Sequence, residues 1–100
     1  MKEQDKVADF IEENDLNAKA EFRILDLVSE VGEVAKDANK SAEYGERPED
    51  LDVKKDEIGD VFFSLLALAD SLGIGVGEAL DEALEKYNMR ISEKGSPTSE

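Results

Sequence analysis

The segment 61–69 constrains the fold most, because every residue in it except Ser64 is apolar. It is too short to cross a bilayer as a helix, which takes about 20 apolar residues. A helix that is apolar almost all round must instead be surrounded by other helices. A chain of 100 residues has one modest core and few helices to provide that cover. We therefore predict that part of this helix is buried between copies of the chain.

Apolar residues recur at helical spacing elsewhere in the chain, and no segment shows the alternation of a strand. We predict helices over about 4–13, 18–42, 51–73 and 76–92, the third capped by Asp50 and ended by Gly73. The residues expected to face inward are Val7, Phe10 and Ile11; Ile24, Val28, Val31, Ala35 and Ala38, widened by Leu27 and Val34; and Ala79, Leu80, Ala83, Leu84, Tyr87 and Ile91. The predicted fold is all-α, a four-helix-bundle-like domain over residues 1–93 that oligomerisation completes, with a flexible tail over 94–100.

The composition excludes several classes of function. Asp and Glu number 26 against 12 Lys and Arg, for a net charge of −14, which opposes binding to nucleic acids and to anionic membranes. The chain has no Cys and no His, so any metal site must use oxygen ligands, which favours hard cations such as Mg²⁺, Mn²⁺ or Ca²⁺. The first ten residues are charged, unlike a signal peptide, and we expect a cytoplasmic protein.

Two pairs of acidic residues have the same spacing on two of the predicted helices. Glu30 and Glu33 lie one turn apart on one face, and so do Glu57 and Asp60. Glu30 and Glu57 also fall in line with the apolar stripes, where burial of a charge is unfavourable and like charges repel. A divalent cation would reverse that repulsion, so a metal site between the two helices is one interpretation. Ordinary surface acids are the other, because acidic pairs at this spacing are common in the chain.

Three ordered segments resemble motifs of one enzyme family. Residues 27–36 resemble the first motif of the MazG-type nucleoside triphosphate pyrophosphohydrolases, 56–61 resemble the second, and 82–90 resemble a signature on a later helix. The similarity spans roughly residues 20–92. It implies an all-α enzyme, usually dimeric or tetrameric, that cleaves a nucleoside triphosphate between the α- and β-phosphates with Mg²⁺, or alternatively Mn²⁺.

The resemblance also implies roles for individual residues. The implied catalytic metal ligands are Glu30, Glu33, Glu57 and Asp60, and the implied phosphate-binding residues are Lys86, Arg90 and Lys36. Glu30 is the favoured acceptor of the proton from the attacking water. Lys86 has a second interpretation, an i,i+4 ion pair with Glu82 on a solvated helix face. Ser29 stands where many family members have another glutamate, so the number of metal ions is left open.

The sequence is compatible with two functions. The leading hypothesis is a Mg²⁺-dependent pyrophosphohydrolase, of the kind that removes surplus or non-standard nucleotides. The alternative is a non-catalytic helical oligomerisation or interaction protein that retains the fold. Base recognition by Phe62, Phe63, the first helix or a neighbouring subunit is open, because each is also plain core material.

Overall fold

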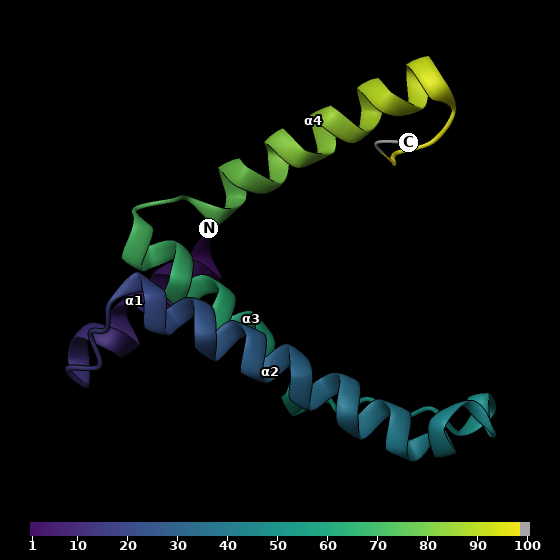
Figure 1. Ribbon diagram of the computed structural model, residues 1–100. Coiled ribbons are helices and arrows are strands. Elements are labelled where there is room, and N and C mark those ends of the chain that lie inside the picture. The colour runs from purple at the N-terminus through teal and green to yellow at the C-terminus, as the bar shows by residue number, and fades with distance from the viewer. Residues whose placement is uncertain (99–100) are drawn as a thin grey trace.

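The computed structural model describes residues 1–98, which form four α-helices and contain no strand. The helices are α1 Lys2–Glu13, α2 Ala20–Ser41, α3 Lys55–Leu72 and α4 Val76–Lys94, and two short 3₁₀ turns, Glu43–Gly45 and Pro48–Asp50, link α2 to α3. Helices α1, α2 and α3 pack together, while α4 projects away from them (Figure 1). The predicted all-α class is confirmed. Residues 99–100 of the predicted tail lie outside the described residues.

The core of the chain lies where α3 meets α1 and α2. Leu66 is only 1% exposed, and Ile11 of α1 is also buried. Phe10 and Phe63 meet edge to face with ring centroids 5.9 Å apart, which joins α1 to α3. Arg23, at the start of α2, is buried and donates a hydrogen bond to the backbone carbonyl of Leu16. That bond fixes the link between α1 and α2.

The turn between α3 and α4 is held by a side chain of α1. Gly73 ends α3 in the left-handed region at φ 67°, as the sequence predicts. The Gln4 amide donates to the Ile74 carbonyl at 2.7 Å and accepts from the Val76 N–H at 2.8 Å. Helix α4 then leaves α3 at a bend of 102°. Within residues 1–98 no single helix is long and apolar enough to cross a membrane, and only α3 and α4 taken as this bent pair meet that length and composition.

The predicted start of α3 is wrong by about one turn. The helix begins at Lys55, and Asp50 does not cap it. The Asp50 carboxylate instead pairs with Arg47 at 2.9 Å within the linking segment. The Ser41 hydroxyl accepts a hydrogen bond from the Asp52 N–H at 2.8 Å, and the chain is non-helical from there to Lys54.

The predicted inward faces of α2 and α4 are not buried within one chain. Val28 is 64% exposed, and Ile24 and Val31 are also exposed, so it is Leu27 and Val34 that turn towards the other helices. None of the residues of α4 is buried. The reason is the bend after α3, which carries α4 away so that a single chain does not close a four-helix bundle.

Candidate functional site

A polar cavity of about 320 Å³ opens between the C-terminal end of α2 and the N-terminal end of α3. These two helices run antiparallel, so residues near position 37 lie close to residues near position 57 (Figure 1). The residues that line this polar cavity are Asp37, Lys40, Ser41, Asp52, Lys54 and Glu57. The cavity therefore mixes carboxylates with lysines.

Glu57 is the most perturbed side chain in the polar cavity. Its Oε2 atom is shielded from solvent and has no hydrogen-bond partner. Burial raises the pKa of Glu57, the neighbouring Asp37 and Asp56 raise this pKa further, and Lys54 partly offsets the effect. The surroundings thus disfavour the negative charge of Glu57. A cation at this point would relieve both the desolvation and the repulsion.

The raised pKa of Glu57 predicts a pH-dependent stability. At neutral pH the charged carboxylate destabilises the fold, and this penalty disappears below the unfolded-state pKa, where Glu57 is protonated in both states. We expect Glu57→Gln to raise the melting temperature at pH 7 in the presence of EDTA, and the gain to fade towards pH 4. Thermal denaturation followed by circular dichroism at several pH values measures this. Glu33→Gln, an exposed residue on α2, is the control for the change in net charge. An equal gain in that variant at every pH would contradict the prediction.

The other predicted ligands are less buried than Glu57. Glu30 is half-buried on α2, whereas Glu33 and Asp60 are exposed. In the part of the chain that the structure describes, no group of three or more acidic side chains is close enough to hold one metal ion. The four-carboxylate ligand set therefore stays a prediction. Of the four, Glu57, which is in line with an apolar stripe of α3, lines the polar cavity.

Sequence reasoning missed five residues of the polar cavity, namely Asp37, Lys40, Ser41, Asp52 and Lys54. Asp37 follows Glu33 by four residues, and Lys40 follows Lys36 by four, so each continues a helix face already identified. Asp52 and Lys54 belong to the extended segment that the sequence assigned to a helix. The spacing could have indicated Asp37 and Lys40, but the register that places them beside Glu57 is a property of the packed helices.

The predicted phosphate-binding residues are on separate parts of the molecule. Lys36 is exposed on α2, outside the residues that line the polar cavity. Lys86 and Arg90 are on α4, the arm that diverges from α2 and α3 (Figure 1). Both flank the Tyr87 ring, with the Lys86 Nζ 5.4 Å and the Arg90 Cζ 6.0 Å from its centroid. A single chain does not bring these cations to the polar cavity.

The aromatic candidates for base recognition also differ in their surroundings. Phe63 is half-buried and packs against Phe10. Phe62 is exposed and lines an apolar groove of about 600 Å³ between α2 and α3. Of the two, Phe62 is the more accessible to a ligand or to another helix.

The chain is an all-α protein with a polar cavity between two antiparallel helices. Comparison with known proteins identifies its family. Residues 18–93 match the model of the MazG nucleotide pyrophosphohydrolase domain, so the chain belongs to the MazG family. The chain is also 42% identical over 72 residues to the uncharacterized protein YpjD of Bacillus subtilis. That match covers 68% of this chain and 63% of the relative, so the chain spans somewhat less than two thirds of that protein. No solved structure matches the chain significantly.

Proposed function

We propose that this protein hydrolyses nucleoside triphosphates to nucleoside monophosphate and pyrophosphate with the help of Mg²⁺. Membership of the MazG family supports the reaction class. The observation that carries the proposal is the Oε2 atom of Glu57, a solvent-shielded carboxylate oxygen without a partner in a polar cavity. An enzyme that must concentrate negative phosphates beside negative side chains requires such a position for a cation.

The chemistry of the donors fits Mg²⁺. All the available ligands are oxygens, and Mg²⁺ in phosphate-processing enzymes commonly uses one or two protein carboxylates together with substrate phosphates. In this proposal Glu57 and Asp60 of α3 and Glu30 and Glu33 of α2 hold the metal. When bound, the ion supplies charge neutralisation of the triphosphate and polarisation of the α-phosphoryl group. Mn²⁺ has similar ligand preferences and is the expected substitute.

The side chains of the chain supply the remaining roles. A water oxygen attacks the α-phosphorus, the bond from that phosphorus to the oxygen bridging the α- and β-phosphates breaks, and pyrophosphate leaves. Glu30, half-buried on α2, is proposed to accept the proton of the water. Lys40 and Lys54 line the polar cavity and place positive charge where phosphate oxygens would enter.

The substrate is a free nucleotide, since the net charge of −14 opposes binding to a nucleic acid. A cytoplasmic role in clearing unwanted nucleotides would suit such an enzyme.

The test is a panel of nucleoside triphosphates, standard and modified, incubated with the protein and Mg²⁺. We expect monophosphate and pyrophosphate in equal amounts from at least one of them, resolved by ion-exchange chromatography. Release of orthophosphate and a diphosphate instead would contradict the assigned bond. Absence of cleavage from every nucleotide would favour the alternative, a non-catalytic interaction protein, which the exposed apolar residues of α3 and α4 would equally serve.

Metal binding has its own readout. A cation that binds only the folded state stabilises it, by about 2.7 kcal/mol when its concentration is 100 times the dissociation constant. We expect Mg²⁺ to raise the melting temperature of the wild-type protein and to have a much smaller effect on Glu57→Gln. An equal shift in both proteins would show that Mg²⁺ binds elsewhere.

A further inference from the structure

The chain between α2 and α3 forms a closed loop, residues 41–52, whose two ends belong to the polar cavity (Figure 1). The Asp52 N–H donates to the Ser41 hydroxyl oxygen at 2.8 Å, and both residues line that cavity. Inside the loop the Arg47 N–H donates to the Ala42 carbonyl at 2.9 Å. Compact loops with joined ends frequently carry function. Loop 41–52 is thus held beside the proposed metal site by its own hydrogen bonds.

Tyr44 stands in this loop in an unfavourable conformation and environment. Its backbone lies in the left-handed region at φ 56° and ψ 39°, directly after Glu43 at φ 49°. Residues other than Gly adopt this region at a cost, and such strain clusters at ligand-binding sites. The Tyr44 side chain is also 78% exposed, the largest fraction of any aromatic residue in the described part of the chain. The loop therefore presents an aromatic ring to an outside molecule.

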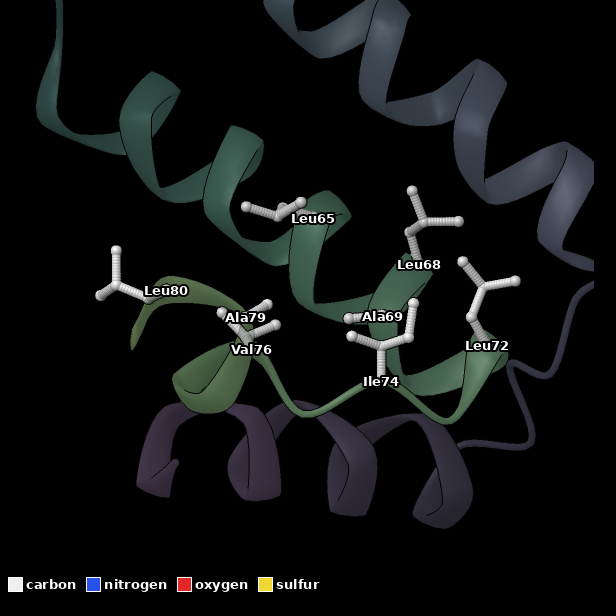
Figure 2. Close-up of a pocket in the computed structure, with 8 residues that line it drawn as sticks. All are labelled: Leu65, Leu68, Ala69, Leu72, Ile74, Val76, Ala79 and Leu80. Atoms are coloured by element: carbon white, nitrogen blue, oxygen red, sulfur yellow. The ribbon is translucent and has the colours of Figure 1, made fainter. Parts of the chain in front are cut away.

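The two apolar hollows of the chain are poor sites for a nucleobase. Among the described residues that line the groove of about 600 Å³ beside Phe62, Lys55 alone has a polar side chain. A second hollow of about 360 Å³, where α3 bends into α4, is lined by aliphatic side chains alone (Figure 2). A base buried in either would leave most of its N–H and C=O groups without hydrogen bonds. Stacking on the exposed ring of Tyr44 leaves those polar edges accessible to water.

The charges of loop 41–52 set the orientation of a nucleotide beside it. The acids of the loop are Glu43, Glu46, Glu49, Asp50 and Asp52. Its single basic residue, Arg47, is paired with Asp50 at 2.9 Å. The lysines Lys40 and Lys54 lie instead in the polar cavity. Phosphate groups are therefore repelled by the loop and attracted towards the cavity, which leaves the uncharged base for the loop.

We propose that Tyr44 binds the nucleobase of the substrate by stacking, while the triphosphate occupies the polar cavity; this assignment rests on the proposed function, because it concerns the base end of the same nucleotide. Tyr44 is three residues from Ser41 of the cavity, so their Cα atoms are at most about 11 Å apart. Every base has a face that can stack on an aromatic ring. Tyr44 thus favours nucleotides over inorganic polyphosphates and accepts a broad range of bases.

Steady-state kinetics with the best nucleotide of the panel test this role. Tyr44→Ala is expected to raise KM about 10-fold or more with little change in kcat, because stacking on the base stabilises the bound ground state and the transition state alike. Tyr44→Phe keeps an aromatic ring and should retain a KM near that of the wild type. Inorganic tripolyphosphate has no base, so as a competitive inhibitor it should bind the wild type and Tyr44→Ala equally.

The control for the kinetic test is Leu51→Ala, which truncates a side chain that is 56% exposed in the same loop. Its KM should equal that of the wild type, and circular dichroism should show each variant as helical as the wild type. An unchanged KM in Tyr44→Ala would overturn the proposal. So would an equal rise in Leu51→Ala, or an equal loss of tripolyphosphate binding in Tyr44→Ala, because either would show a general disturbance of the loop.

Nuclear magnetic resonance tests base stacking without catalysis. The chain has two tyrosines, so labelling them selectively gives two sets of ring signals, which Tyr44→Phe assigns. The probes are α,β-methylene analogues of nucleoside triphosphates with the four standard bases, which resist cleavage at the proposed bond. We expect at least one analogue, but not tripolyphosphate, to move the ring protons of Tyr44 upfield.

The outcomes separate this inference from the proposed function. Cleavage of a nucleotide to monophosphate and pyrophosphate, with unmoved Tyr44 signals and an unchanged KM in Tyr44→Ala, would refute base stacking and leave the proposed hydrolysis standing. Upfield movement of the Tyr44 signals in a protein that cleaves no nucleotide would support base stacking and count against hydrolysis.

Discussion

Replacing Glu57 by Gln is expected to lower the rate of pyrophosphate release about 100-fold or more. A metal ligand contributes to catalysis through charge, and the loss of several kcal/mol of transition-state stabilisation corresponds to at least two factors of about ten. The amide keeps the size of the side chain, so the helices should remain folded. Initial rates of pyrophosphate release at saturating Mg²⁺, with the best substrate from the nucleotide panel, measure the effect.

Two further variants, one of a second proposed ligand and one control, accompany the Glu57→Gln measurement. Asp60→Asn should lose activity to a similar extent, because the second motif supplies both carboxylates to the proposed metal. Asp70→Asn removes an equal charge from an exposed position at the far end of α3 and should keep nearly full activity. Full activity in Glu57→Gln would remove Glu57 from the mechanism, even though the fold and the family would stand.

Leu66→Ala is expected to lower the free energy of unfolding by about 3 kcal/mol, within the usual range of 2–5 kcal/mol for such a truncation. Leu66 is the one fully buried large side chain among the described residues, where α3 meets α1 and α2. Its removal both loses apolar burial and leaves a cavity that rigid helices fill poorly. Urea unfolding at a fixed protein concentration measures the loss, because association would otherwise change the apparent stability.

The matched control for this truncation is Leu25→Ala. Leu25 is 63% exposed on α2. The same chemical change there should lower the free energy of unfolding by well under 1 kcal/mol. Equal losses in both variants would mean that the core described for one chain is not the core that folds.

Much of the fold followed from local sequence signals. Gly73 ends α3 because a left-handed residue is needed there, and the helical periodicity placed α1 and α4 within about two residues. The start of α3 did not follow, because Ser41 and Arg47 hold the segment before it in a way that no local pattern records. The direction of α4 also depends on a distant contact, the one between Gln4 and the turn at Ile74 and Val76.

The candidate site was also predicted only in part, because some of its features follow from local sequence signals and others depend on how the helices pack. Glu57 could be singled out from its position on an apolar stripe, and it proves to be the carboxylate with the shielded oxygen. Asp37 could not be paired with it from spacing alone, since their proximity depends on the register of α2 against α3. The separation of Lys86 and Arg90 from the polar cavity depends on the 102° bend, which the short sequence between the helices does not reveal.

The contact that Gln4 makes gives α1 an influence far from its own position. Helix α4 has 19 residues, about 28 Å, so a tilt of only 10° at Val76 displaces its far end by about 5 Å, close to one full turn of helix. A change of that size would carry Ile91 to a different position relative to α2 and α3. The two hydrogen bonds of Gln4 hold the turn from which α4 starts, so they help to set the direction of α4. Helix α1, which precedes the matched family domain at 18–93, therefore influences where the far end of α4 lies. Relatives that differ in this first helix would be expected to differ in the direction of α4, even with identical carboxylates.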